Sequence, residues 1–374
     1  MNRRLAPALI ALAAVCYSAP AAAQSCPRTY NIYDLGPIQP EDINNNDEVV
    51  GLERQGPFGT EVAVSGYFDS YYVSWGWPAL WLYHLAPPGI PNGVSGHRAT
   101  AISDNGEIIG SVDDLSYSNS RAYTWDMYDY WNHGPVPVHG PPAGGLLNSR
   151  GNDVNNNGTL IGNTGTMDGW IWQNGNQYDA AALNGGMSTA VSDLNDADWV
   201  IGQWFDPQAQ MGPFAYAGEA TSWGYEDLHG CLNTTQPSGF TKSWGELLDN
   251  GGMAVVNGEM ANGNSQLFVL DRATCSKVGL TASVGPNSID PVSSDAVNNQ
   301  GQIVGTGAYG NFEYPFLYEN GTTYNLNNCI NSNSGWVAHV ATGINDRGVI
   351  VGSGELNGVE VGFALEPSTL WWWD

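Results

Sequence analysis

Basic residues are scarce in this sequence. Only 11 lysines and arginines accompany 37 aspartates and glutamates, so the 374-residue chain carries a formal charge of -26 at pH 7. A surface this negative repels phosphate backbones, which argues against nucleic acids and anionic membranes as partners. The same charge suits the solubility of an exported protein.

Long apolar runs are also missing. The run Leu5–Val15 is too short to span a bilayer as a helix, and no other stretch of about 18 apolar residues follows. Arg3 and Arg4 precede this run and Ala21–Ala23 follow it, an order typical of a cleavable signal peptide. We predict a signal peptide over residues 1–23, no membrane span, and a secreted monomer that is extracellular or periplasmic.

Four cysteines remain beyond that segment, at Cys26, Cys231, Cys275 and Cys329. Their wide spacing does not fit a zinc site and is natural for disulfides in an oxidising compartment. Three pairings are possible. The register of the repeats described below favours Cys231 with Cys275 and Cys26 with Cys329.

Recognisable catalytic and metal-binding motifs are absent from the sequence. It contains no H-x-x-x-H pair, no G-x-S-x-G elbow and no glycine loop of the kind that binds phosphate. The segment Asp153–Gly158 has oxygen-bearing residues at alternate positions, as calcium loops do, but lacks the later glutamate that would complete such a site. We therefore predict no catalytic residue, no metal site and no cofactor.

A nine-residue phrase recurs along the chain: an apolar residue, an Asn/Asp-rich turn, Gly, one further residue, two apolar residues and Gly. The starts are 40 to 59 residues apart, a spacing that matches four-stranded propeller blades. The copy at Leu248 is degenerate. The phrase begins at Ile43, Ile102, Val154, Leu194, Leu248, Val297 and Ile344.

Each phrase predicts a β-hairpin with a tight turn. The final Gly of the phrase allows a neighbouring backbone to come close. A third strand is predicted after each hairpin, and a weaker fourth strand, such as TTYNLN at Thr322, after most of them. The predicted third strands are ALWLY at Ala79, RAYTW at Arg121, WIWQ at Trp170, PFAYA at Pro213, QLFVL at Gln266, PFLY at Pro315 and VGFAL at Val361.

These units predict an all-β protein, a single β-propeller of about seven four-stranded blades over residues 24–366, followed by a C-terminal tail over 367–374. Six or eight blades remain open because of the degenerate copy. The last unit lacks a fourth strand, and Thr29–Gly36 has the composition of one. We expect this N-terminal strand to close the last blade, which would remove open sheet edges.

The phrases resemble the HAF-repeat family of extracellular bacterial proteins. That family is marked by an Ala-x-x-Ile-Asn-x-x-Gly-x-Val-Val-Gly hairpin, a short Ala-Phe-Leu-Trp-like strand and Asp-Leu-Gly. The stretch Ser334–Leu365 is the most similar, and Tyr30–Gly36 looks like the family's usual opening. The resemblance covers almost all of the exported chain and implies a secreted repeat protein, without shared catalytic residues.

Aromatic residues are abundant, with 15 Trp and 18 Tyr. Several fill an apparent insertion between Glu53 and Pro78, and a second group lies near the third strand of the second unit. We expect them on the face opposite the hairpin turns, where exposed rings would stack on sugars or contact peptides. For the first group the alternative is a local core that orders the insertion. For the second group, packing between blades explains most of the rings equally well. The predicted binding residues are Tyr71, Tyr72, Trp75, Trp77, Trp125 and Trp131.

Two functions follow from these observations. The first is a non-catalytic binding or scaffold protein whose partner is an extracellular glycan or protein. The second is a propeller hydrolase or lyase that acts on polysaccharide through carboxylates at the channel mouth. The candidate acids for that reaction are Asp69, Asp113, Asp114 and Asp206.

Overall fold

The structure is a computed structural model of the chain. It describes residues 26–55, 60–73, 75, 78–85, 94–114, 120–127, 136–137, 149–165, 168–184, 187–206, 211–220, 224–280, 290–309 and 312–368. The predicted signal peptide lies outside the described residues.

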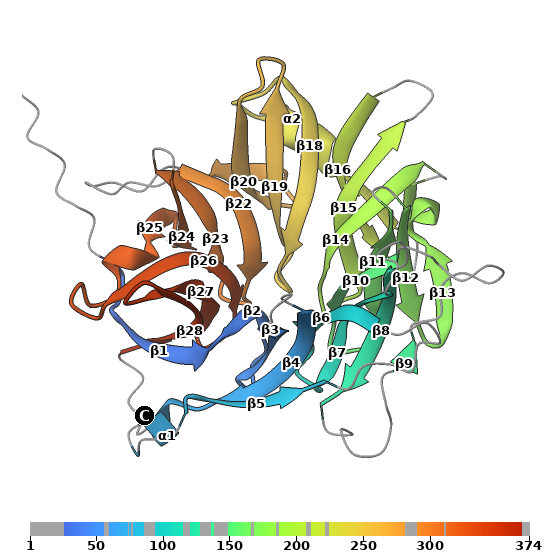
Figure 1. Ribbon diagram of the computed structural model, residues 1–374. Helices are drawn as coiled ribbons and strands as arrows, with labels where there is room; N and C mark the ends of the chain where they lie inside the picture. Colours follow the sequence, from blue (N-terminus) through green and yellow to red (C-terminus); the bar gives the residue numbers. More distant parts are fainter. Residues whose placement is uncertain are drawn as a thin grey trace, which may run out of the picture.

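The architecture is all-β, with 67% strand and 6% helix, and the sheets stand around a common centre (Figure 1). The helical segments are short: α1 (Ser70–Val73), η1 (Ala180–Asn184), α2 (Leu228–Thr234) and η2 (Leu326–Asn328). This arrangement is a β-propeller, as the repeat predicted.

Five sheets have four antiparallel strands each. They are β2 (Ile38–Ile43), β3 (Glu48–Gln55), β4 (Thr60–Phe68) and β5 (Leu80–His84); β6 (Val94–Ile102), β7 (Glu107–Asp114), β8 (Ser120–Asp126) and β9 (Val136–Pro137); β18 (Phe240–Leu248), β19 (Met253–Met260), β20 (Ser265–Asp271) and β21 (Ser276–Gly279); β22 (Asp290–Val297), β23 (Ile303–Tyr309), β24 (Phe312–Glu319) and β25 (Thr322–Asn325); and β26 (Trp336–Ile344), β27 (Ile350–Leu356) and β28 (Val359–Pro367) with β1 (Tyr30–Gly36).

The remaining strands form one eight-stranded sheet, so five separate blades are detected and not the predicted seven. Its two halves are joined by a parallel pair between Asp168 and Thr189. A Cβ on Gly169 would lie 3.1 Å from the Thr189 carbonyl oxygen, so glycine allows this approach. The strands are β10 (Ser149–Val154), β11 (Leu160–Thr164), β12 (Asp168–Gln173), β13 (Asn176–Asp179), β14 (Ser188–Leu194), β15 (Trp199–Asp206), β16 (Met211–Glu219) and β17 (Gly224–Asp227).

The first unit differs from its prediction. Its third strand is β4, which lies inside the apparent insertion, whereas the predicted third strand ALWLY forms β5, the fourth strand of its sheet. The segment ALWLY has the run of apolar and aromatic residues that marks the other predicted third strands, whereas the aromatic residues of TEVAVSGYF come only at its end. Composition therefore points to the fourth strand of this sheet instead of the third.

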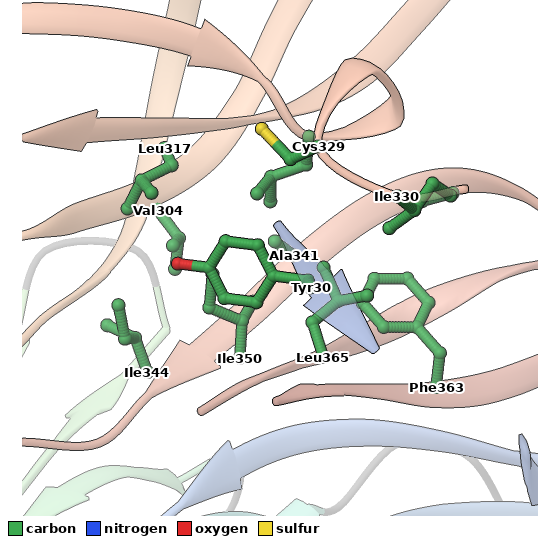
Figure 2. Close-up of a cluster of buried hydrophobic side chains, with 12 residues drawn as sticks. Tyr30, Val304, Leu317, Cys329, Ile330, Ala341, Ile344, Ile350, Phe363 and Leu365 are labelled. Atoms are coloured by element: carbon green, nitrogen blue, oxygen red, sulfur yellow. The ribbon is translucent and has the colours of Figure 1, made fainter. Parts of the chain in front are cut away.

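The two ends of the described chain meet in one sheet, as predicted. β1 pairs with β28 from Tyr30 opposite Pro367 to Gly36 opposite Gly362. Tyr30 is buried with residues of the preceding sheet, including Val304 and Leu317 (Figure 2). The N-terminal strand therefore completes the last sheet and also packs against the sheet of β22–β25.

Both favoured disulfides are present. Cys26, just before β1, bonds Cys329, which follows β25 in the preceding sheet. Cys231 lies on α2 and bonds Cys275 in the turn between β20 and β21. The first bond thus ties the closing strand to the neighbouring sheet.

The same β-bulge recurs in all seven hairpins that the described residues form between the first two strands of a unit. In the first unit the register skips Glu41, between Pro40 and Asp42. The residue opposite the start of the bulge is the final Gly of the phrase, and a Cβ on Gly51 would lie 2.2 Å from the Gln39 carbonyl oxygen. The other skipped residues are Thr100, Asn152, Ser192, Glu246, Asp295 and Thr342.

The degenerate fifth unit keeps the bulge with a different residue pair. Val256 occupies the position of the final Gly, and its partner across the ladder is Gly245. In this unit the glycine of the pair lies on the first strand of the hairpin, not on the second. This exchange explains why the phrase at Leu248 is hard to recognise.

The first Asn of the turn links neighbouring units. The Asn195 side chain accepts hydrogen bonds from the amides of Ala197 and Trp199 and donates to the Asp249 carbonyl at 2.9 Å. An amide side chain is needed because it both accepts and donates. The same three bonds occur at Asn44, Asn155, Asn298 and Asn345.

Removing the Cys26–Cys329 bond is expected to destabilise the protein more than removing the Cys231–Cys275 bond. The two bonds close loops of 303 and 44 residues, for which loop entropy gives about 6 and about 4 kcal/mol. The double Cys→Ser variants should be compared by denaturant unfolding. Equal losses of stability, or a greater loss for the shorter loop, would contradict the expectation that the Cys26–Cys329 bond stabilises the protein more.

Replacing Asn195 with Ala is expected to lower the free energy of unfolding by about 3 kcal/mol, because buried backbone groups in two units lose their partners. Asn195→Ser should cost about half as much. Ser103 occupies the equivalent position in the second unit and still accepts from the Glu107 amide. Urea unfolding measures both variants, and similar losses for Ala and Ser would argue against this account.

Candidate functional site

A polar cavity of about 270 Å³ lies where the hairpin turns converge. We call it the central channel. Its walls come from the end of the first strand and the following turn of every unit, including Asp42, Asp153, Asp193, Asp295 and Thr342. No lysine or arginine lines it among the residues that the structure describes.

The channel mouth is a ring of alternating Asn and Asp side chains. In six of seven neighbouring pairs, the backbone amide of one residue donates to the side-chain oxygen of the next at 2.7–2.9 Å. Each Asp also accepts from the amide groups of both neighbouring Asn residues. The ring consists of Asn45, Asp104, Asn156, Asp196, Asn250, Asn299 and Asp346.

An odd number of positions cannot alternate perfectly. Two Asn residues, Asn250 and Asn299, are therefore neighbours, and among the described residues this pair alone lacks the amide-to-side-chain bond found in the other six. Among the described residues, these hydrogen bonds therefore join every neighbouring pair of units except those of β18–β21 and β22–β25.

Three partly buried aspartates join consecutive units below the mouth. Asp42 accepts from the amide of Ile43 at 2.7 Å and from the amide of Ile102, in the next unit, at 3.0 Å. Asp153 makes the same bridge between Val154 and Leu194. Asp193 accepts from the Leu248 amide at 2.6 Å. These carboxylates hold neighbouring hairpins together.

Burial perturbs the channel carboxylates. It raises the pKa of Asp42 to about 6 despite the two amide donors, and that of Asp295 to about 6. Burial raises the pKa of Glu41 to about 7, although the Arg98 guanidinium opposes the shift. Burial and the adjacent Asp193 raise the pKa of Asp153, which fits a proton shared between the two side chains.

The bulged residues use the same channel wall for further links. Thr100 donates to the Gly151 carbonyl, Asn152 to the Val191 carbonyl and Thr342 to the Pro40 carbonyl, each in the next unit. Glu246 accepts from the amide and hydroxyl of Ser294. The polar groups of the channel thus serve mainly to join units.

The acids proposed from sequence for catalysis do not converge. Asp69 precedes α1 and accepts from the Tyr71 amide. Asp113 and Asp114 lie at the end of β7, and Asp206 at the end of β15 in another sheet. In the described part of the chain, no group of three or more His, Cys, Asp and Glu side chains is arranged to hold a metal ion.

The sequence does contain a signal for the channel carboxylates. Asp or Glu comes one or two residues before the phrase in five units, at Glu41, Asp42, Asp153, Asp193, Glu246 and Asp295. The repeated phrase begins at its apolar residue, so its pattern does not include these acids. The structure shows that five of these six acids, all except Glu246, line the channel.

A second feature is an exposed group of rings on the first unit, which we call the aromatic patch. Tyr71 lies 6.1 Å from Tyr72 and 6.2 Å from Trp75, and Tyr72 lies 6.2 Å from Trp81, measured between ring centroids. Trp81 on β5 is directly opposite Tyr67 on β4. The aromatic patch comprises Tyr67, Tyr71, Tyr72, Trp75, Trp81 and Tyr83, all exposed.

The aromatic patch contains three of the predicted binding residues. Tyr71, Tyr72 and Trp75 are exposed, with Trp75 at 66%. Trp125 is only 6% exposed and packs in the core between the first two units, so it does not extend this surface. Trp77 and Trp131 lie outside the described residues.

The aromatic patch lies on the turn side of the propeller, not on the opposite face as expected. The amide of Phe68, at the end of β4, donates to the carbonyl of Asp47 in the first turn. The third strand, β4, runs from the opposite face to the turn side before α1 begins. The aromatic residues therefore follow the third strand and do not form a connection between the second and third.

The fold defines the class: a β-propeller protein. Similar solved structures include an oligogalacturonate lyase in complex with manganese, with a TM-score of 0.53, 11% identity and coverage of 93% of this chain and 99% of that chain. A prolyl endopeptidase has a TM-score of 0.52 and 8% identity, over 91% of this chain and 51% of that chain. At these identities the similarity shows the fold alone.

No family model and no curated protein matches the sequence. Within the described residues, no helix is long and apolar enough to cross a membrane.

The free energy of unfolding is expected to fall as the pH rises from about 4.5 to 7.5. A carboxyl group with a raised pKa in the folded state favours folding while it is protonated, and this stability is lost as the pH passes the folded-state pKa. Glu41→Gln should flatten this dependence and stabilise the protein at pH 7.5 by on the order of 1–3 kcal/mol. Urea unfolding across this pH range measures both effects.

The exposed Glu360 provides the control. Glu360→Gln should leave the pH dependence unchanged. If the unfolding free energy of Glu41→Gln fell with pH as steeply as that of the parent protein, ionising Glu41 in the channel would not destabilise the fold.

Proposed function

We propose that this protein is a secreted, non-catalytic binding protein that recognises a neutral glycan through the aromatic patch. One observation carries the proposal: of the eight exposed aromatic residues in the described chain, six belong to the aromatic patch. Chance exposure would scatter such rings over the surface. Their concentration on one unit of an otherwise polar protein indicates a ligand.

The chemistry of the aromatic patch suits sugar rings. Flat apolar faces stack on the C–H faces of sugars, and polar groups nearby bond hydroxyls. Glu53, Gln55 and His84 form an exposed polar cluster beside Tyr83, with the His84 Nε2 atom 2.6 Å from Glu53 and 2.9 Å from Gln55. The formal charge of -26 opposes a polyanionic glycan.

The cellular address and the family are part of the same proposal. The signal-peptide pattern, two disulfides and the repeat phrases support an extracellular or periplasmic protein of the HAF-repeat type. We further propose that the eight-stranded sheet acts as two blades, giving a seven-bladed ring. Its support is that both halves carry the same hairpin, bulge and turn as the five separate blades.

Catalysis in the channel has weaker support. Asp153 and Asp193 are adjacent carboxyl groups, but their oxygens accept backbone hydrogen bonds from Val154, Leu194 and Leu248. A general acid or base needs an oxygen directed at the substrate. We therefore assign these groups to the assembly of the ring.

The test is a glycan array followed by titration calorimetry with the neutral glycan that binds best. Changing Tyr71 and Trp75 to Ala together is expected to weaken binding at least tenfold, about 1.4 kcal/mol, because the stacking surface is removed. Phe312→Ala is the matched control, since Phe312 is equally exposed but lies on β24. Unchanged affinity in the double variant, or an equal loss in the control, would refute the proposal.

A further inference from the structure

A second cavity, of about 490 Å³, lies between the eight-stranded sheet and the sheet of β18–β21. Trp199 and Glu226 line it from one sheet, and Arg272, Ser276 and Val278 from the other. It is separate from both the aromatic patch and the central channel. We call it the Arg272 pocket.

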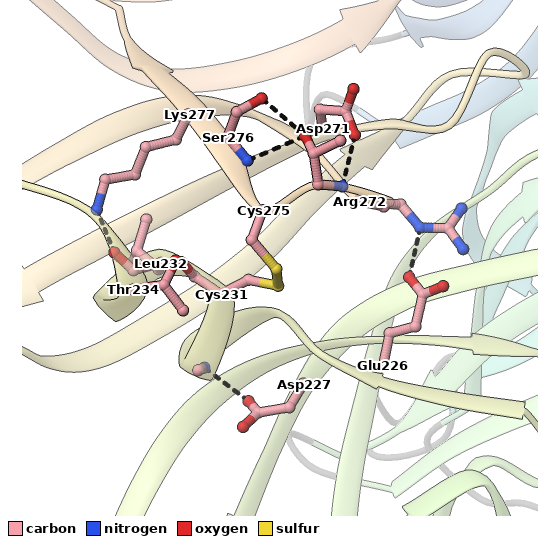
Figure 3. The surroundings of a disulfide bond; sticks show 12 residues. Glu226, Asp227, Cys231, Leu232, Thr234, Asp271, Arg272, Cys275, Ser276 and Lys277 are labelled. Carbon is pink, nitrogen blue, oxygen red and sulfur yellow. Dashed lines mark hydrogen bonds and ion pairs between the residues drawn. A yellow bond between two sulfur atoms is a disulfide. The ribbon is translucent and has the colours of Figure 1, made fainter.

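Arg272 is held firmly in this pocket. Its guanidinium carbon lies 3.8 Å from the centroid of the Trp199 ring, and its Nε atom donates to Glu226 at 2.8 Å (Figure 3). Its backbone amide donates to the Gly252 carbonyl. The side chain is only 8% exposed. These contacts fix the guanidinium before any ligand arrives.

The remaining donors of this side chain are unused. Neither Nη group of Arg272 has a hydrogen-bond acceptor among the described residues, and Figure 3 shows only Nε joined to a partner. A guanidinium presents its Nη groups as a planar fork that matches a carboxylate. In a chain with 11 basic residues and 37 acids, a well-ordered arginine with free donors needs an explanation.

The other walls complete a mixed site. Glu226 and Asp271 place two carboxylates beside the single guanidinium, so the three charged groups sum to one negative charge. A simple anion would be repelled by that balance, and a simple cation would face Arg272. The apolar wall comprises Met253, Val269, Ala273 and Val278, and Val278 is 56% exposed.

We propose that the Arg272 pocket binds a free α-amino acid with an aliphatic side chain. The ligand carboxylate pairs with the Nη groups of Arg272, and its ammonium faces Asp271 and Glu226. The aliphatic side chain covers Val278 and Met253. A zwitterion satisfies both signs of charge without a net penalty, and the cavity volume accommodates a ligand of this size.

The neighbouring disulfide supports the same site. Cys275 lies in the turn that carries Arg272, and its bond to Cys231 fastens this turn to α2 (Figure 3). The Lys277 side chain donates to the Thr235 carbonyl at 2.9 Å and adds a second tie. A turn fixed at both sides loses little conformational freedom on binding, which favours affinity for a small ligand.

The test is titration calorimetry on the disulfide-intact protein with L-leucine as the probe. L-leucinamide lacks the carboxylate and N-acetyl-L-leucine lacks the ammonium, so each is expected to bind at least tenfold more weakly than leucine. Arg272→Gln should cause a similar loss. The exposed Arg54 on β3 gives the control variant Arg54→Gln, which should bind leucine as the parent protein does.

A second variant fills the pocket with a larger side chain and leaves the buried Arg272 in place. Val278→Trp adds a ring at an exposed position of the cavity wall, so the thermal unfolding midpoint should be retained while leucine binding is lost. The inference is overturned by any of three results: no leucine binding at about 10 mM, leucinamide binding as tightly as leucine, or unchanged leucine affinity in Val278→Trp. None of these three results bears on the aromatic patch, whose ligand is assayed separately.

Discussion

The structure depends on one extra residue in the first strand of each unit. The bulge turns a polar side chain away from its own ladder and toward the backbone of the next unit, as Thr100, Asn152 and Thr342 show. A bulge also bends its strand and raises its twist. A single unit therefore carries hydrogen-bond donors that are satisfied by the backbone of the next unit, so each unit depends on its neighbour.

This requirement accounts for the chemistry of the channel. Its carboxylates are partly buried, and burial disfavours their charged form. The backbone amides that they accept from adjacent hairpins offset part of this cost, as at Asp42 and Asp153. A propeller centre lined by acids thus need not be an active site, since here the acids bind the protein to itself.

The surfaces suited to ligands lie outside the ring of turns. The aromatic patch lies on the third and fourth strands of the first unit and the segment between them, and the Arg272 pocket lies between two neighbouring sheets beside the turn at Gly251 and Gly252. Inner strands are constrained by their neighbours on both sides, whereas the outer connections are free to vary. This division would allow one scaffold to hold the two proposed sites.

The sequence alone determined the all-β class, the hairpin phrase and the completion of the last sheet by the N-terminal strand, because each depends on local turn chemistry or on a count of strands. The register of the repeats favoured the disulfide pairing that the structure contains. The sequence left open whether Tyr71, Tyr72 and Trp75 are exposed or form a local core. It misplaced the third strand of the first unit, and with it the face of the aromatic residues, because ALWLY has the composition of the other third strands but forms the fourth strand. Only the tertiary structure decided which acids face the channel, that Trp125 is buried and that Arg272 stands over Trp199 beside Glu226. These relations join residues of different units, and the packing between sheets sets their distances.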